Sequence, residues 1–132
     1  MEPSPRELAL HAARKMLDKG AEELVILELP PEQRVLYDYV VVANGRSERQ
    51  VSTLIDEIYH FCKRHEIAHF PSEGEAGWRL IDCHEVVAHA LLPELREHYQ
   101  LEALWPGAVT IDYDSELAAL PDPDQDKARL DS

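Results

Sequence analysis

The segment Asp82-Cys83-His84-Glu85-Val86-Val87-Ala88-His89 places carboxylate, thiol and imidazole groups, which bind transition metals in proteins, within eight consecutive positions. A zinc-binding helix of the HExxH type needs two histidines four positions apart. Here His84 and His89 are five apart, which turns the second side chain by about 140° beyond a full helical turn and puts it on the opposite face of a strand. The spacing therefore predicts no metal site. It favours a hairpin corner at residues 83–85, followed by a strand with a partly buried His89.

The other reactive side chains lack the surroundings that their chemistry needs. Adjacent histidines do not aim an imidazole at the Cys83 thiol, and Cys62 and Cys83 form no CxxC motif, which favours two buried thiols over a redox pair or a zinc ribbon. Gly45-Arg46-Ser47 opens a predicted helix and has backbone N–H groups that can hold an anion, although most such helix starts bind nothing. Asp112 and Asp114 have the spacing of a metal-binding carboxylate pair, but no phosphate-cradling loop precedes them. We interpret this pair as part of a solvated acidic tail.

Helix caps and apolar periodicity predict the elements around these residues. Ser4-Pro5-Arg6-Glu7 has the form of a helix start, and Ser47 with Gln50 repeats its capping-box spacing. Strand, helix and strand over residues 37–70 predict a right-handed βαβ unit with parallel pairing, and the short gap between 82 and 86 predicts a hairpin. We expect helices from Ser4 to Gly20, from Ser47 to about His65 and at 94–99, and strands at 24–29, 37–43, 67–70, 78–82 and 86–92, with room for a short strand at 109–111.

The composition limits the class of partner. The chain has 132 residues, of which 26 are acidic and 13 basic, with a net charge of −13. This charge works against binding a phosphate backbone, which requires Lys and Arg, and favours a basic protein surface. The sequence shows no signal peptide and no apolar run of membrane-spanning length, so we expect a soluble, cytoplasmic protein without membrane contact. We predict one domain over residues 1–107 and an acidic extension over 108–132, whose last dozen residues are disordered.

Three segments carry a family resemblance. Residues 37–51 read YDYVVVANGRSERQV, Glu73-Gly74 is followed by Trp78, Asp82 and Val86-Val87-Ala88-His89, and residues 94–105 read ELREHYQLEALW. In this order and spacing they resemble motifs of the ribosomal silencing factors, also called the RsfS or Iojap family, over residues 7–107. The family usually has Gly at the hairpin corner, where this chain has His84, a residue that tolerates positive φ better than most.

The resemblance implies a fold and a function. The fold would be α/β, with a mixed sheet of about five strands flanked by helices, related to nucleotidyltransferases but without their catalytic carboxylates. The partner would be ribosomal protein fourteen of the large subunit, and occupying it would block docking of the small subunit and repress translation. Family members are also linked to large-subunit assembly. No catalysis and no cofactor are implied.

Eight residues are candidates for the partner surface. Trp78 is the candidate anchor, because buried aromatic residues dominate interface energetics, although it is equally well explained as core. Glu73, Asp82 and Glu85 would face basic groups of the partner, or are ordinary solvated carboxylates. The family motifs also match Asp38, Tyr39, Arg49 and Gln50, which serve either the partner or the fold by capping and hydrogen bonding. An exposed sheet edge would allow a homodimer.

Two alternatives of other classes remain open from the sequence. A metal-dependent nucleotidyltransferase-like enzyme or small hydrolase would use Asp112 and Asp114, or the cluster at 82–89. A family-like scaffold would bind a different basic protein. Bound metal and nucleotide-dependent thermal stabilisation would distinguish the enzyme from both binding proteins.

Overall fold

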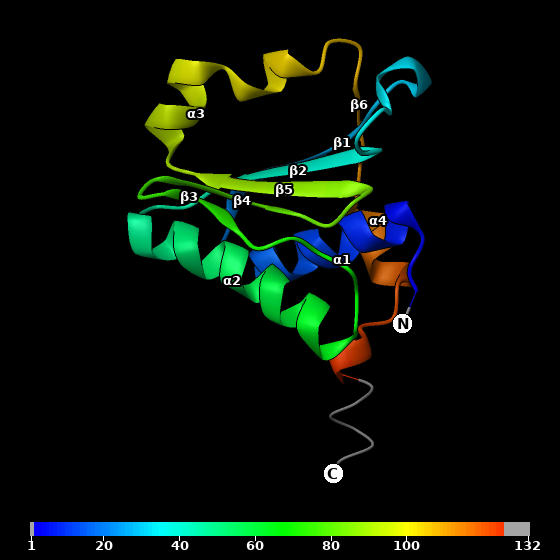
Figure 1. Cartoon of the computed structure of the whole chain (residues 1–132). Coiled ribbons are helices and arrows are strands. Elements are labelled where there is room, and N and C mark those ends of the chain that lie inside the picture. Colours follow the sequence, from blue (N-terminus) through cyan, green and yellow to red (C-terminus); the bar gives the residue numbers. More distant parts are fainter. Residues whose placement is uncertain (1, 126–132) are drawn as a thin grey trace.

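The computed structural model describes residues 2–125, in which a central sheet lies between two helical layers (Figure 1). α1, α2 and α4 lie below the sheet, and α3 with the segment after it lies above. The helices are α1 (Pro5–Asp18), α2 (Glu48–Arg64), α3 (Pro93–Tyr99) and α4 (Asp114–Ala119), with 3-10 helices η1 (Pro31–Gln33) and η2 (Leu101–Leu104). The strands are β1 (Glu22–Glu28), β2 (Tyr39–Asn44), β3 (Glu73–Glu75), β4 (Trp78–Asp82), β5 (Val86–Leu91) and β6 (Val109–Thr110).

The two long helices begin at the residues that the sequence predicts. The Ser4 hydroxyl accepts from the Glu7 N–H at 3.1 Å, while the Glu7 carboxylate accepts from the Ser4 N–H at 3.0 Å, which completes a capping box. Ser47 caps α2 in the same way through the N–H of Gln50. Both helices therefore start where their free N–H groups find partners.

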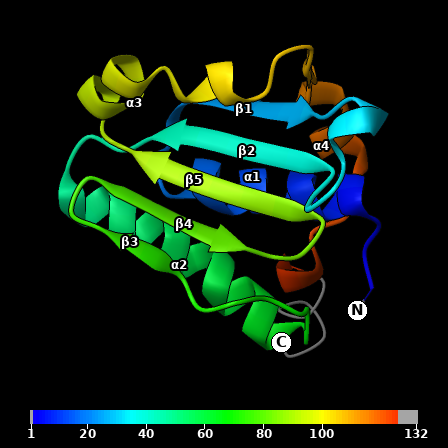
Figure 2. The same cartoon turned by 45° about the horizontal axis from the view of Figure 1, so that its top comes forward.

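The sheet is mixed, as expected, and has six strands in the order β3-β4-β5-β2-β1-β6 (Figure 2). β2 and β5 pair in parallel, while the other pairs are antiparallel, including the predicted β4–β5 hairpin. The expected strand at 67–70 is wrong: these residues belong to no strand, and the parallel partner of β2 is β5. Ile67 packs into the core, but the one backbone bond of this stretch to the sheet runs from the Phe70 N–H to the Asp82 carbonyl oxygen. The apolar residue types of this stretch produced the strand-like pattern, although only Ile67 is buried.

Alternate residues of each strand serve two separate cores. Tyr39, Val41 and Ala43 of β2 face the α1 and α2 layer, whereas Val40 and Val42 face the α3 layer with Leu101 and Trp105. Both faces of β2 and β5 are covered, so all residues of these two strands are buried. This burial explains the continuous apolar runs of both strands.

The acidic extension contributes to the fold as far as it is described. β6 pairs with β1, Ile111 is buried, and α4 packs against α1. Residues 121–125, which we expected to be disordered, are in contact with the helices: Lys15 contacts both Asp122 and Asp124. Residues 126–132, the rest of that prediction, lie outside the described residues. The boundary at residue 107 stays a prediction.

Both edges of the sheet are short. β3 has three residues, two of them glutamates, and β6 has two residues. Short, charged edges disfavour the addition of another strand, so the predicted homodimer stays a prediction and would need a larger contact than the edge alone. Among residues 2–125, no helix is both long enough and apolar enough to cross a membrane.

Candidate partner-binding surface

The corner between β4 and β5 is built by the side chain of Asp82. Its Oδ1 accepts from the His84 N–H at 2.8 Å, and the Cys83 N–H donates to the Val86 carbonyl oxygen at 2.8 Å. His84 has φ of 69°, a left-handed conformation that glycine adopts more easily. The corner predicted from the sequence is therefore present, with a backbone cost at His84 that the Asp82 hydrogen bond helps to offset.

Three of the predicted site residues share one face of the sheet. Glu73 lies opposite Leu80 and Glu75 opposite Trp78 in the antiparallel β3–β4 pair, and side chains directly opposite each other point to the same side. Side chains alternate between the two faces of a strand, so Asp82, four positions after Trp78 on β4, lies on the same face as Trp78. This face is the one on the α3 side of the sheet. At the β3–β4 end the face is only partly covered, and Glu73 and Glu75 are exposed.

Trp78 is half-buried and belongs to a row of aromatic rings. Its Nε1–H donates to His89 Nδ1 at 3.2 Å, and its ring centroid lies 5.4 Å from that of Tyr99. His89 in turn lies 5.9 Å from Trp105. Burial lowers the pKa of His89 to about 4, so the ring is a neutral hydrogen-bond acceptor at pH 7. Trp78 is thus held by the fold while part of its surface reaches solvent.

Two hollows meet beside the corner. One, of about 440 Å³, is lined by Leu36, Phe70, Asp82, His84 and Glu85, and the other, of about 340 Å³, by Phe70, Pro71, Glu73 and Asp82. Leu36 and Phe70, which share the first hollow, are two large apolar side chains exposed to solvent, at 79% and 52%. We call Leu36, Phe70, Glu73, Asp82, His84 and Glu85 the corner surface.

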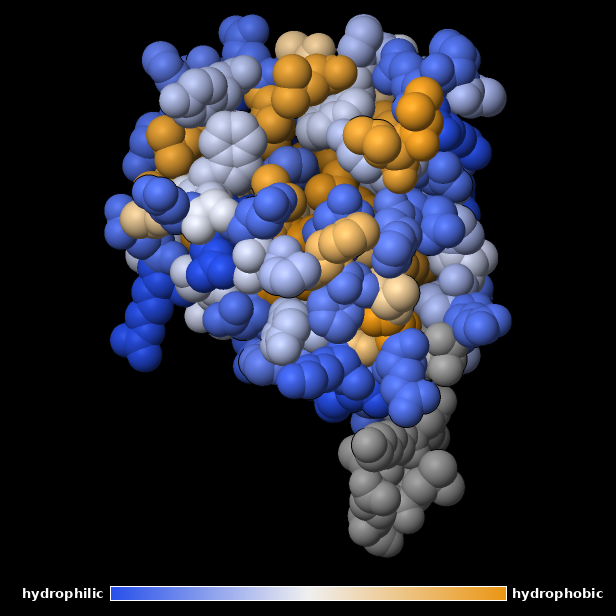
Figure 3. All heavy atoms as spheres, in the orientation of Figure 1, coloured by the Kyte–Doolittle hydropathy of each residue, from blue (hydrophilic) through white to orange (hydrophobic). Residues whose placement is uncertain are grey.

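The corner surface combines apolar groups with a carboxylate rim. Asp82, Glu73 and Glu85 carry three negative charges around Phe70 and Leu36. Space-filling spheres show hydrophobic side chains in several groups among many hydrophilic ones on the face seen in Figure 3. Apolar centres with charged rims are typical of protein interfaces, and the sign of this rim suits a basic partner.

The other predicted residues lie elsewhere and have structural contacts. Tyr39 is buried on the α1 side, where its hydroxyl donates to Glu28 at 2.8 Å. Gln50 connects the two long helices, because its side-chain amide donates to the carbonyl oxygens of Lys19 and Gly20. Asp38 holds the corner from the backbone: its N–H donates to the Glu85 carbonyl oxygen at 2.7 Å.

Arg49, on the first turn of α2, is exposed and has no contact with the corner surface. It lines a separate hollow beside Arg46, Ser47, Gln50 and Thr53. The structure therefore does not bring Tyr39, Arg49 or Gln50 together with Trp78 and Asp82.

The metal sites that the enzyme alternative would use are not formed in residues 2–125. In this part of the chain, no three His, Cys, Asp or Glu side chains lie together as metal ligands. Asp112 and Asp114 are both exposed and follow β6, so the strand geometry expected for a carboxylate pair is not formed. His84 is exposed at the predicted corner, and His89, expected to be partly buried, is buried within β5.

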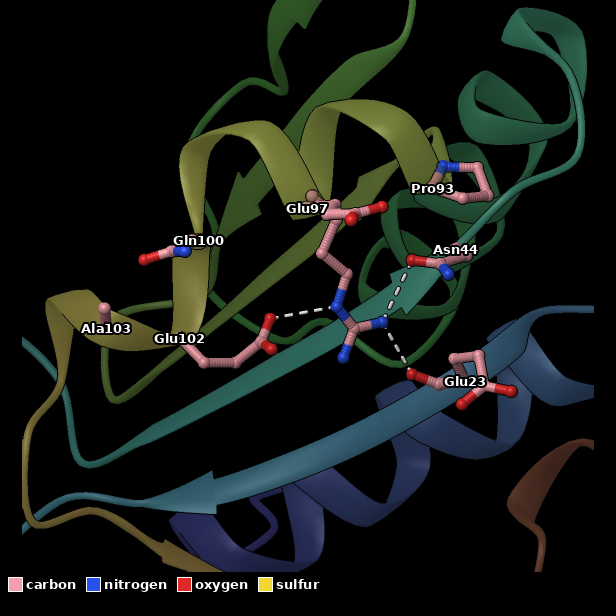
Figure 4. A pocket seen from close by; sticks show the side chains of 8 residues that line it. Glu23, Asn44, Pro93, Glu97, Gln100, Glu102 and Ala103 are labelled. Carbon is pink, nitrogen blue, oxygen red and sulfur yellow. Dashed lines mark hydrogen bonds and ion pairs between the residues drawn. The ribbon is translucent and has the colours of Figure 1, made fainter.

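Another hollow, lined by Arg96 and the residues labelled in Figure 4, has a structural explanation. Its volume is about 520 Å³, and Glu23, Asn44, Glu97 and Glu102 are among its lining residues. Arg96 donates to Glu102 Oε1 and Asn44 Oδ1, both at 2.9 Å, and to the Glu23 carbonyl oxygen at 2.6 Å. The guanidinium therefore joins α3 to β1, β2 and η2.

Comparison with known proteins identifies the family. The family model described as "Ribosomal silencing factor during starvation" (RsfS) matches residues 2–131. The chain belongs to the RsfS family. A ribosomal silencing factor RsfS from Chromobacterium violaceum is 36% identical over 103 residues, which cover 76% of this chain and 81% of that protein. RsfS proteins are named for a ribosomal regulatory role.

Two further relatives extend the comparison. The mouse protein named "Mitochondrial assembly of ribosomal large subunit protein 1" is 32% identical over 92 residues, covering 66% of this chain and 40% of the mouse protein. A crystal structure of a Chromobacterium violaceum protein superposes with a TM-score of 0.74 at 30% identity, covering 80% of this chain and 88% of the other. The RsfS fold predicted from the sequence motifs is thereby confirmed, with six strands in place of about five.

Sequence reasoning missed Leu36 and Phe70 of the corner surface. Phe70 is the last residue of the strand expected at 67–70, where an aromatic residue is ordinary, and Leu36 lies in a loop without periodicity. The pair Val35-Leu36, which follows a Pro-Pro turn, could have indicated this surface. Two adjacent apolar residues in a polar loop can mark a site of contact with a partner.

Proposed function

We propose that this RsfS-family protein binds ribosomal protein fourteen of the large subunit through the corner surface and Trp78, and thereby prevents association of the small subunit. The observation that carries the proposal is the carboxylate rim of Glu73, Asp82 and Glu85 around exposed Phe70 and Leu36. Such a surface is complementary to a basic protein with apolar contact points. Binding there would repress translation by steric exclusion, in the cytoplasm, without any chemical step.

The name of the mouse relative supports a second aspect of the same role. That protein is named for assembly of the ribosomal large subunit. A protein that keeps the small subunit from docking on the large subunit can serve both assembly and silencing. Both processes require that the docking face of the large subunit is not occupied by the small subunit.

Co-sedimentation with purified large subunits tests the proposal. Glu73 and Glu85 have exposed side chains and no side-chain hydrogen bond among residues 2–125, so the double variant Glu73→Lys/Glu85→Lys should fold normally. We expect it to bind large subunits at least roughly ten-fold more weakly than the unaltered protein, because two attractive contacts become repulsive. It should also fail to reduce the yield of joined ribosomes when small subunits are added.

Asp18→Lys/Asp56→Lys is the control matched in charge. Asp18 in the last turn of α1 and Asp56 on α2 are exposed carboxylates of the helical layer below the sheet, outside the corner surface. This variant should bind as the unaltered protein does. Equal weakening in both variants would indicate a general charge effect, and undiminished binding of the double variant would exclude the corner surface as the site.

A further inference from the structure

Two cysteines that are distant in sequence lie in contact below the sheet. Cys62, in the last turn of α2, and Cys83, at the β4–β5 corner, have their Sγ atoms 3.8 Å apart. Both thiols are free and buried, with exposed fractions of 0% and 3%. A separation of 21 positions without a CxxC motif gave no sign of this contact in the sequence.

The geometry allows a covalent bond with small movements. A disulfide needs its sulfur atoms about 2.05 Å apart, so the two sulfur atoms must approach by roughly 1.7 Å. One thiol belongs to a 17-residue helix and the other to a corner. Cys83 is the part that can adjust, because it lies in a turn where its N–H bonds to the Val86 carbonyl oxygen, while the bonds from Asp38 and Tyr39 hold Glu85 rather than Cys83.

A small oxidant can reach the pair from one side. Cys83 lines a hollow of about 430 Å³, together with Leu8, Ile67, His84 and Glu85. The hydrogen bond from Cys83 lowers the pKa of Cys62, while the same contact and burial raise the pKa of Cys83. The hydrogen bond therefore favours the thiolate at Cys62, and transfer of a proton across the 3.8 Å contact moves the thiolate to Cys83, which lines the hollow.

We propose that Cys62 and Cys83 form an oxidisable dithiol that closes reversibly to a disulfide on reaction with a hydroperoxide. One thiolate attacks the O–O bond, takes one oxygen as a sulfenic acid, and releases water or an alcohol. The second thiol attacks that sulfur, an S–S bond forms, the S–O bond breaks and water leaves. Two thiols are oxidised and one peroxide is reduced, and an added dithiol reverses the bond by exchange.

The bond would tie α2 to the corner. Asp82, His84 and Glu85 adjoin Cys83, so a disulfide would fix the backbone from which the corner surface projects. This consequence for partner binding rests on the proposed function, whereas the oxidation itself does not.

Mass spectrometry of the full chain tests the proposal without reference to ribosomes. The folded protein is treated with hydrogen peroxide, then unfolded and alkylated. We expect loss of two hydrogen masses, loss of both titratable thiols, a cross-linked peptide pair containing Cys62 and Cys83, and full recovery of both thiols with dithiothreitol. Two alkylated cysteines after treatment, or oxidation to sulfinic acid without an S–S bond, would overturn the proposal.

Single variants give the matched comparison. Cys62→Ala and Cys83→Ala each remove one partner, and neither should show the intramolecular loss of two hydrogen masses. Large-subunit binding of the oxidised and reduced unaltered protein is then measured separately. If the reduced protein does not bind, the proposed function fails, while the disulfide result still stands or falls on the mass measurement alone.

Discussion

His89 shows how one buried side chain makes stability depend on pH. Burial lowers its pKa to about 4 from an ordinary value of 6.5. Between these pH values the unfolded state binds more protons than the folded state, so the free energy of unfolding falls as pH falls from 6.5 towards 4. A shift of this size corresponds to a loss on the order of 3 kcal/mol.

His89→Asn should reduce this pH dependence. The Asn side-chain oxygen can replace Nδ1 as acceptor for the Trp78 Nε1–H, whereas it carries no titrating group. Urea midpoints at pH 7 and pH 4.5 should differ less in the variant than in the unaltered protein. A residual dependence should remain from His11, whose pKa is lowered to about 4 by burial and by Arg14. His60→Gln, at an exposed position, should leave the difference unchanged, and an unchanged difference in His89→Asn would contradict the argument.

Single residues were predictable where a local rule fixes them. The cap at Ser4 and the corner at His84 depend on neighbours in the chain, and both are observed. The contact between Cys62 and Cys83 depends on how α2 packs against the sheet, and no local pattern contains that information. The same reason explains why Tyr39 and Gln50, which match family motifs, have contacts within the fold rather than on the corner surface.

The C-terminal segment contains a helix, α4, that the sequence did not predict. Its acidic, proline-containing composition is typical of a disordered tail, yet α4 and the residues to 125 are held by basic side chains of α1 and α2. Arg6 makes two bonds to Glu116, and Arg14 donates to the carbonyl oxygens of Leu117 and Leu120. β3 was missed for a related reason, because three exposed residues show no apolar alternation. Partners distant in sequence hold α4, whereas β3 is defined by its backbone pairing with the neighbouring β4.

Asp124 is the strongest single link of this segment. Its carboxylate contacts Lys15 at 2.5 Å, Arg64 at 2.7 Å and His65 at 2.6 Å. Burial by itself raises the pKa of Asp124, but the hydrogen bonds from Arg64, Lys15 and His65 outweigh this and hold the pKa well below its usual range. Its contribution is therefore present above about pH 3.9, the unfolded value, and is lost as pH falls below it.

Asp124→Asn should destabilise the protein at pH 7 by about 1–3 kcal/mol, because Lys15, with a side chain only 8% exposed, loses its nearest counter-charge. Urea denaturation measures the change, and faster proteolysis of the C-terminal segment should accompany it. Asp112→Asn, at an exposed position without side-chain contacts among residues 2–125, is the control and should stay within about 0.5 kcal/mol of the unaltered protein. Equal stability of the two variants would show that the ion cluster contributes nothing measurable.

At the scale of the whole molecule, net charge and the arrangement of the layers act together. The chain carries a charge of −13, and three basic residues of α1 and α2, Arg6, Lys15 and Arg64, are paired with acidic residues of the C-terminal segment. The layers leave the β3–β4 end of the α3 face partly open, where Glu73 and Asp82 lie. The acidic corner surface is therefore available, whereas part of the basic charge of the opposite layer is neutralised within the fold; Arg49 and Lys63 stay exposed there.

This distribution predicts a strong preference for a basic protein surface over nucleic acid. Binding of a fluorescently labelled protein to large subunits should weaken as salt rises from 50 to about 300 mM, because screening shortens the range of the attraction to roughly a Debye length of 6–14 Å. The same protein should show no binding to protein-free ribosomal RNA at either salt concentration, since bringing −13 charges to a phosphate backbone releases no counterions. Glu73→Lys/Glu85→Lys should lose the salt-sensitive part of large-subunit binding. Equal affinity for the free RNA and the subunit would contradict the argument from charge. Binding would then not depend on the acidic residues of the corner surface.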